Sequence, residues 1–143
     1  MIAKFLRSRV AHRNNVLHKL TEEFGALGLL VHGGYRPAVA HDIATLGHIL
    51  HTEGEGRSRK LLKKTFKALK SGGVIAIGEW LVNDQRTEPS PSLIFAVNMF
   101  IHSERGDTFS FNEIKNWLED AGFKKVRKLE APGPSPLILA NKP

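Results

Sequence analysis

Hydrophobic and polar positions follow a regular order from residue 42 onward, and they predict a strand, a helix and a second strand. Residues 42–51 form an apolar run short enough for a buried strand, and the polar and glycine residues at 52–56 predict a loop after it. In the next segment apolar residues recur at helical spacing and basic residues fill the rest of the circumference: Leu61, Leu62, Phe66 and Leu69 against Arg59, Lys60, Lys63, Lys64 and Lys67. The turn at 71–73 ends this helix, and the continuous apolar run at 74–82 is typical of a strand in a parallel sheet. The order predicts a βαβ unit.

The remaining pattern predicts a helix and an antiparallel strand pair after this unit. Residues 92–101 are apolar enough to pack as a helix or lid, and Ser110 with Glu113 forms the capping-box spacing that begins another helix. Two short runs, at 124–129 and 137–140, flank a turn rich in proline and glycine. They predict two antiparallel strands at a sheet edge. The expected fold class is therefore α/β.

Residues 1–41 have a weaker pattern, which allows a helix over 10–27 and a short strand within 28–34. We therefore divide the chain into an atypical basic N-terminal segment, 1–41, and an α/β region, 42–143. The net charge is +7, and residues 1–41 hold six Lys/Arg against two Asp/Glu. This invites a nucleic-acid interpretation, but there is no arginine-rich run and no aromatic platform among the basic residues. We expect no nucleic-acid partner.

Length and composition exclude several classes of protein. The 143 residues suit a single domain, and the absence of cysteine removes disulfides, thiolate metal sites and cysteine nucleophiles. No apolar stretch reaches the roughly 18–20 residues that a membrane-spanning helix needs, and the N-terminus lacks the features of a signal peptide. We expect a cytoplasmic protein with no membrane partner and no bound metal ion.

Several short motifs follow one another in residues 42–143 in a specific order. Asp42 begins the first strand, His51 ends it and an acidic stretch follows; a Leu-Leu-Lys-Lys helix, a glycine pair and a strand ending in Glu79 come next. Further motifs continue the series at 98–102, 106–107, 111–114 and 121–123. This series resembles the second half of the catalytic domain in S-adenosylmethionine-dependent O-methyltransferases that act on small hydroxylated molecules, the caffeate and hydroxyindole type.

The resemblance implies a partial Rossmann-like methyltransferase sheet and methyl transfer from S-adenosylmethionine to the oxygen of a small hydroxylated aromatic molecule. It makes His51 the base and Glu79 the carboxylate that orients it. A phenol titrates near pH ~10, so an imidazole within hydrogen-bond reach is a suitable base. The family's second orienting acid falls on Thr108 in an ungapped comparison and on Asp107 after a shift of one residue.

Other residues acquire roles from the same resemblance. Met99 and Phe100 match residues that clamp an aromatic substrate, although an apolar segment of this kind is more often core than pocket. His102 either touches the substrate or ends a helix. Gly47 and His48 lie near the expected path of the cofactor, but His48 is more typical of a packed or solvent-facing residue. For His51 the alternative is a histidine that merely ends a strand in a solvated loop.

The glycine-rich turn and the ribose-binding acid of a nucleoside-binding domain have no counterpart before Asp42. Three explanations stay open: a truncated chain, a chain completed by a second copy or another chain, and a fold that has left catalysis. We expect a homo-oligomer that covers the edge of the first strand or residues 92–101. The competing functions are a non-catalytic interaction or oligomerisation module and a nucleic-acid binder that uses Arg7, Arg9 and Arg13.

Overall fold

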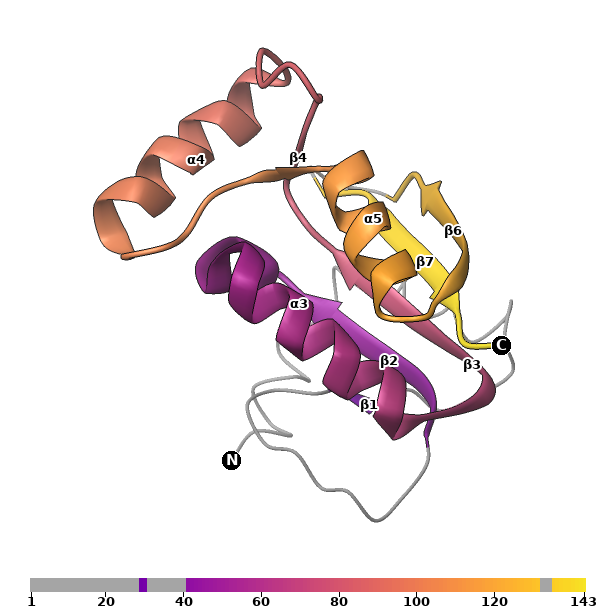
Figure 1. Ribbon diagram of the computed structural model, residues 1–143. Coiled ribbons are helices and arrows are strands. Elements are labelled where there is room, and N and C mark those ends of the chain that lie inside the picture. Colours follow the sequence, from indigo (N-terminus) through magenta and orange to yellow (C-terminus); the bar gives the residue numbers. More distant parts are fainter. Residues whose placement is uncertain (1–28, 31–40, 132–134) are drawn as a thin grey trace, which may run out of the picture.

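A five-stranded mixed sheet forms the body of the molecule. The computed structural model describes residues 29–30, 41–131 and 135–143 (Figure 1). The strand order is β1-β2-β3-β7-β6, with β1 to β3 parallel and β7 antiparallel to both of its neighbours. The strands span Leu29–Leu30 (β1), His41–Gly47 (β2), Leu69–Gly78 (β3), Leu137–Asn141 (β7) and Lys124–Leu129 (β6). The predicted antiparallel pair near the C-terminus is confirmed, with β6 at the sheet edge.

The predicted βαβ unit is confirmed as β2, the helix α3 (Leu50–Ala68) and β3. The two strands run parallel in a register from Ile43 opposite Val74 to Gly47 opposite Gly78. Side chains on both faces of β3 are buried: Ile75 and Ile77 join the core beneath α3, and Ala76 joins a second cluster with Leu139. The continuous apolar run thus reflects a strand that is buried on both sides.

The predicted loop at 52–56 is wrong, because these residues belong to α3. The helix begins at Leu50, and the side chain of its N-cap residue, Ile49, makes no capping hydrogen bond. The helix is interrupted at Gly54, where φ is 68° and ψ is 170°. A Cβ at this position would lie 2.6 Å from the carbonyl oxygen of Arg105, so only glycine fits both the dihedral angles and the close approach. Two glycines and two glutamates in five residues are typical of a loop, and tertiary contacts override that local preference.

The predicted strand at 74–82 also differs from the structure. β3 already begins at Leu69, directly after α3 ends at Ala68, and it ends at Gly78. Leu81–Val82 form a separate strand, β4, which pairs in parallel with β5 (Phe109–Ser110). The break falls at Glu79, whose carboxylate is buried and accepts a hydrogen bond from the Trp80 backbone N–H. The apolar run hides this break because Leu81 and Val82 are buried as well.

The helix α5 (Phe111–Asp120) confirms the predicted capping box. The Ser110 hydroxyl accepts from the Glu113 N–H at 3.2 Å, and the Ser110 N–H donates to the Glu113 carboxylate at 2.7 Å. Its buried side chains are Ile114, Trp117 and Leu118. α5 lies beside α3 on one face of the sheet (Figure 1), and their buried residues form one core with β2, β3 and β7.

Residues 90–102 form the helix α4 (Ser90–His102), which confirms the helical interpretation of the apolar segment. This helix stands apart from the sheet at one end of the molecule (Figure 1). Its outer side chains Ile94, Val97, Phe100 and Ile101 are between 60% and 83% exposed. The expectation that this segment belongs to the core is therefore wrong for Phe100.

The N-terminal segment contributes one described element, β1, which confirms a short strand within 28–34. Its two residues pair with Ala44 and Thr45 of β2, so the outer edge of β2 is partly covered rather than open. The expected helix over 10–27 and the three arginines of the nucleic-acid hypothesis lie outside the described residues. Among the described helices, none has the length and apolar character to cross a membrane.

Candidate functional site

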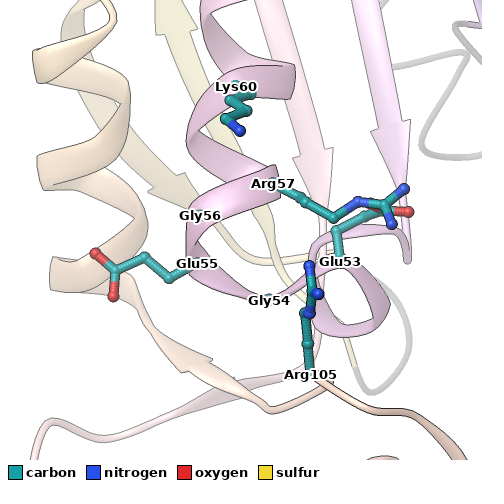
Figure 2. Close-up of a pocket in the computed structure, with 7 residues that line it drawn as sticks. All are labelled: Glu53, Gly54, Glu55, Gly56, Arg57, Lys60 and Arg105. Carbon is teal, nitrogen blue, oxygen red and sulfur yellow. The ribbon is translucent and has the colours of Figure 1, made fainter.

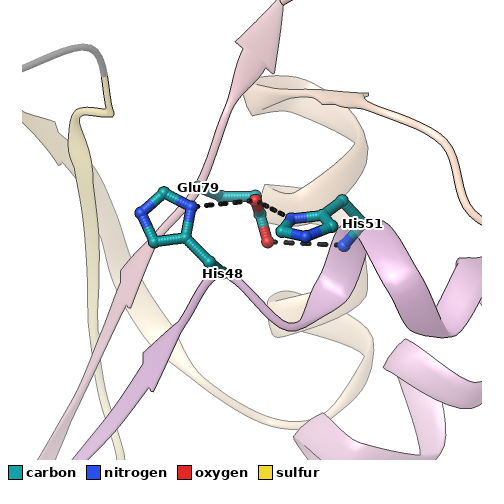
Figure 3. A group of neighbouring side chains, drawn as sticks. All are labelled: His48, His51 and Glu79. Carbon is teal, nitrogen blue, oxygen red and sulfur yellow. Dashed lines mark hydrogen bonds and ion pairs between the residues drawn. The ribbon is translucent and has the colours of Figure 1, made fainter. Parts of the chain in front are cut away.

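His51 and Glu79 meet at the edge of the sheet where β2 and β3 end. The Nδ1 of His51 lies 2.6 Å from Oε1 of Glu79 (Figure 3). Both side chains are buried, with the residues exposed by 6% and 0%. Glu79 directly follows β3, as predicted, whereas His51 lies in the first turn of α3 and not at the end of β2. The carboxyl ends of parallel strands are where α/β sheets bind ligands.

The carboxylate of Glu79 also anchors the start of α3. Its Oε2 accepts from the backbone N–H groups of Leu50 at 3.0 Å and of His51 at 3.4 Å. The N–H groups of a first helical turn have no partner inside the helix, and a side-chain oxygen normally satisfies them. Here an oxygen from 28 residues along the chain takes that role. The same contacts orient Glu79 toward the imidazole.

Aromatic packing fixes the plane of the His51 ring. Phe95 of α4 meets it edge to face, with ring centroids 4.8 Å apart and planes at 85°, and Trp80 stacks on Phe95 at 5.3 Å. A carboxylate only accepts hydrogen bonds, so the Nδ1 of His51 carries the hydrogen and Nε2 of the neutral ring keeps its lone pair. Sequence reasoning missed Phe95. The available signal was its position four residues before Met99, on the same helical face.

The predicted cofactor-side residues lie at the rim of this site. Gly47 ends β2, and a Cβ placed on it would meet no heavy atom within 4 Å. His48 has a positive φ of 54°, and its Nδ1 is 3.9 Å from Oε1 of Glu79. Its side chain is 34% exposed. The donor atoms of His48, His51 and Glu79 all lie within 4.8 Å of one another, which is close enough for a shared metal ion.

Asp107 approaches His51 through its backbone. Its N–H donates to the carbonyl oxygen of His51 at 2.9 Å, while its carboxylate accepts from the Thr108 N–H and the Arg86 guanidinium. Thr108, the other candidate for a second orienting group, is fully buried, and its hydroxyl has no hydrogen-bond partner. The structure thus brings the main chain of Asp107, and not its carboxylate, to His51.

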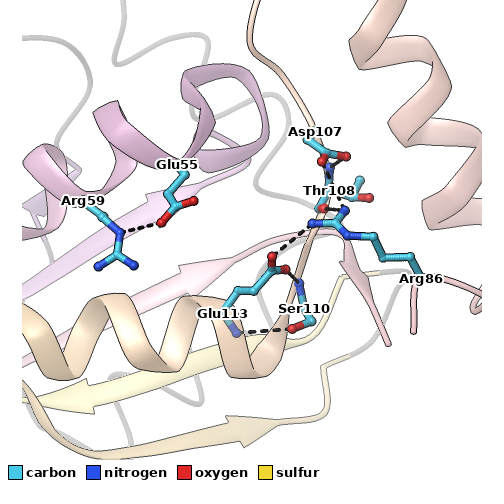
Figure 4. A network of polar contacts seen from close by, with 7 residues as sticks. All are labelled: Glu55, Arg59, Arg86, Asp107, Thr108, Ser110 and Glu113. Atoms are coloured by element: carbon cyan, nitrogen blue, oxygen red, sulfur yellow. Dashed lines mark hydrogen bonds and ion pairs between the residues drawn. The ribbon is translucent and has the colours of Figure 1, made fainter. Parts of the chain in front are cut away.

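Polar contacts tie the segment around Asp107 to the body of the protein (Figure 4). The Arg86 guanidinium donates to Asp107, to the Thr108 carbonyl oxygen at 2.8 Å and to Glu113 at 3.0 Å. A second network joins α3 to α5 through Arg59, which donates hydrogen bonds to Glu55 of α3 and to Asp120 of α5. These bonds raise the pKa of Arg59, and the bond to Glu55 contributes more than the bond to Asp120. The Arg86 contacts hold Asp107 and Thr108 against the start of α5, and the Asp107 N–H to His51 carbonyl bond ties the same segment to the start of α3.

The three predicted substrate-side residues of α4 have different surroundings. Met99 is partly buried beside Gly106, where a Cβ would lie 3.2 Å from the Met99 Cβ and 2.7 Å from the His51 carbonyl oxygen. Phe100 is 83% exposed. His102 is exposed near the helix end, with Nδ1 3.0 Å from the Asn98 carbonyl oxygen. The structure therefore brings Met99 near the site and leaves Phe100 and His102 facing outward.

A pocket of about 210 Å³ lies at the interruption of α3 (Figure 2). Charged side chains and glycines line it: Glu53, Gly54, Glu55, Gly56, Arg57, Lys60 and Arg105. Arg57 pairs with Glu53 across one turn of the helix. The acidic stretch of the sequence motif thus forms part of a charged pocket, whereas His51 and Glu79 do not line it.

Comparisons with known proteins agree on one family. The model of the O-methyltransferase domain matches residues 30–124. The tetracenomycin polyketide synthesis 8-O-methyl transferase TcmO of Streptomyces glaucescens is 33% identical over 107 residues, which are 75% of this chain and 32% of that protein. The 3-hydroxy-5-methyl-1-naphthoate 3-O-methyltransferase of Streptomyces sahachiroi is 34% identical over 104 residues, or 71% of this chain and 30% of that protein. The chain thus spans about a third of the length of these relatives.

Solved structures give the same result for the fold. Human N-acetylserotonin methyltransferase in complex with SAM superposes with a TM-score of 0.70 and 25% identity, over 76% of this chain and 31% of that one. PigF with SAH superposes with a TM-score of 0.71 and 25% identity, over 76% of this chain and 36% of that one. These likenesses confirm the predicted partial Rossmann-like methyltransferase sheet.

Proposed function

Because the chain belongs to the O-methyltransferase domain family, we propose that it supplies the base-bearing half of an S-adenosylmethionine-dependent O-methyltransferase site. The proposed substrate is a small aromatic molecule with a hydroxyl group. The observation that carries the proposal is the 2.6 Å contact between the Nδ1 of His51 and the carboxylate of Glu79. One of the relatives is named for methylating a hydroxynaphthoate, which supports this substrate class.

In the proposed reaction His51 accepts the proton of the substrate hydroxyl at Nε2. Glu79 holds the ring through Nδ1 and offsets the positive charge that forms on the imidazole after proton transfer. When bound, S-adenosylmethionine would supply a methyl group that is activated by its positively charged sulfur, and that sulfur would be the leaving group when the substrate oxygen takes the methyl. The buried position of Glu79 strengthens its effect on the ring, because solvent screens the pair weakly.

The described residues fit one end of such a cofactor. The open space at Gly47 and the half-exposed His48 lie at the carboxyl end of β2, beside the imidazole, and these two residues would line the reactive end of the cofactor. Residues 29–30, 41–131 and 135–143 include no strand followed by a glycine-rich turn that would bind the nucleoside. The described residues therefore supply the base and one end of the proposed cofactor site.

Two measurements test this proposal. Calorimetric titration of the full chain with S-adenosylmethionine measures binding, and transfer of a labelled methyl group to a panel of hydroxylated aromatics measures activity. His51→Ala is expected to lower the rate by about 10²–10⁴, the usual contribution of a positioned base. His41→Ala is the matched control on β2, and it should keep the native rate. Equal rates for His51→Ala and the native chain would contradict the role of His51.

The alternative is a non-catalytic interaction or oligomerisation module. The apolar outer face of α4 favours it, since four large side chains of one helix are 60–83% exposed. On this alternative the chain forms a homo-oligomer through α4 and binds no cofactor. Val97→Lys should then convert the assembly to monomers in sedimentation, whereas Lys115→Ala on α5 should leave it unchanged. A monomeric native chain at high concentration would exclude this alternative.

A further inference from the structure

Two imidazoles and one carboxylate converge at the edge of the sheet, from three separate parts of the fold. His48 follows β2, His51 lies in the first turn of α3, and Glu79 follows β3 (Figure 3). Their donor atoms all lie within 4.8 Å of one another. We propose that this cluster binds a divalent transition-metal ion, with Zn²⁺ as the best-suited ion.

The donor set matches the chemistry of zinc. Imidazole nitrogen and carboxylate oxygen are both common zinc ligands, and two histidines with one glutamate leave a fourth position for water. A tetrahedral ion with bonds of about 2.0–2.1 Å places its donors roughly 3.4 Å apart. The Nδ1 of His48 is 3.9 Å from Oε1 of Glu79 and the Nδ1 of His51 is 2.6 Å from it. The third donor pair, His48 with His51, lies within 4.8 Å, so side-chain adjustments of up to about 1.4 Å reach coordination geometry.

The surroundings of the cluster hold the carboxylate in place and leave a route for the ion. Backbone N–H groups of Leu50 and His51 bind Oε2 of Glu79, so the outer hydrogen bonds that orient a metal-binding carboxylate already exist. His51 and Glu79 are buried, while the side chain of His48 is 34% exposed. Solvent reaches the cluster from the His48 side, where the ion would enter.

A bound ion would change what His51 does. Coordination at Nδ1 displaces the hydrogen that this nitrogen shares with Glu79, and the ring takes up a proton at Nε2 in exchange, so His51 stays neutral and releases no net proton. A neutral imidazole bound through Nδ1 carries its remaining hydrogen on Nε2, so it has no lone pair there to accept a proton. Zinc would therefore inhibit methyl transfer. This consequence depends on the proposed function, whereas binding of the ion does not.

The test is a titration of the full chain with Zn²⁺, followed by calorimetry, and with Co²⁺, followed by its visible absorption. The native chain should bind one ion at this cluster, with the intense bands of four-coordinate Co²⁺. His48→Gly removes one ligand and also suits the positive φ of 54° at this position. It should weaken binding by at least about tenfold, the lower limit for disturbing a metal site. His102→Ala removes an exposed histidine of α4 and should not change affinity.

Circular dichroism establishes that His48→Gly is folded, and His48→Asn, whose side chain also tolerates positive φ, provides a second test. The chain has seven histidines, so these variants separate this cluster from the others. Equal zinc affinity in the native chain and both variants would overturn the proposal, as would the absence of binding to the native chain. Zinc binding without any methyl transfer would contradict the proposed function alone, and methyl transfer unaffected by bound zinc would contradict the inhibition.

Discussion

The carboxylate of Glu79 binds the imidazole of His51 at 2.6 Å and, with its other oxygen, the backbone N–H of the same residue at 3.4 Å. One acidic side chain therefore fixes both the ring and the main chain of His51. Burial of both residues protects these contacts from water. The relationship links the stability of α3 to the orientation of the proposed base.

Glu79→Gln tests this link. The amide oxygen can replace only one carboxylate oxygen as an acceptor, so one or more buried N–H groups lose their partner. We expect a loss of about 1–3 kcal/mol in the free energy of unfolding, measured by urea denaturation. Glu130→Gln alters an exposed carboxylate paired with Lys128 and should cost far less. Equal stability of the two variants would contradict the capping role of Glu79.

Gly54→Ala tests the interruption of α3. A methyl group at this position meets the Arg105 carbonyl oxygen at 2.6 Å, and φ is 68°. We expect destabilisation of at least about 1 kcal/mol, the lower end for a residue held in such a region. Gly56→Ala is the matched control, because its methyl group would meet no atom within 4 Å and the residue is helical. That variant should gain roughly 0.5–1 kcal/mol. Similar effects in both variants would contradict this account.

Phe95→Leu tests the aromatic support of His51. The substitution removes the edge contact to the imidazole and the stacking with Trp80. The tryptophan emission should shift, and methyl transfer should fall by up to about 100-fold if the ring moves from its aligned position. Phe100→Leu changes an 83% exposed ring of the same helix and should leave the emission unchanged. An unchanged spectrum for Phe95→Leu would count against the stacking.

Asp84 predicts a dependence of stability on pH. Hydrogen bonds from Ser110, the larger effect, and from Asn112 lower the pKa of this carboxyl below its ordinary value. Its contribution is therefore present above the unfolded pKa and is lost as the pH falls through the folded pKa. Asp84→Asn should lower the Tm slightly at neutral pH, and the difference should shrink as the pH falls below the ordinary aspartate pKa of about 3.9. A difference that stays constant from pH 7 to pH 3 would contradict this assignment.

Local patterns in the sequence predicted much of this fold. The Ser110 and Glu113 spacing predicted the start of α5, and the apolar run before Glu79 predicted β3, because neighbouring residues determine both features. The start of α3 escaped prediction, because its N–H groups bind a carboxylate 29 residues away. The position of α4 depends on the contacts of Phe95 with Trp80 and His51, which no local pattern reveals.

The candidate site was predictable only in part, because the sequence shows the order of its motifs but not the contacts between distant residues. The order of motifs identified His51 and Glu79, and the structure places them in contact. The approach of His48 to the same carboxylate depends on a positive φ that the sequence does not signal for histidine. The use of the Asp107 main chain could not be foreseen either, since a side-chain motif says nothing about backbone hydrogen bonds.

Glu79 both accepts the N–H groups at the start of α3 and holds the imidazole of His51. These two roles would respond differently to a loss of activity during evolution. A copy that abandoned methyl transfer would still need an acid here to begin α3, so selection for folding alone would retain it. Histidine at position 51 has no comparable duty toward the helix, because its ring nitrogen only receives support from the acid. Under the proposed function, retention of the imidazole at position 51 would therefore distinguish chains that keep a base from chains that do not, whereas retention of the acid would not.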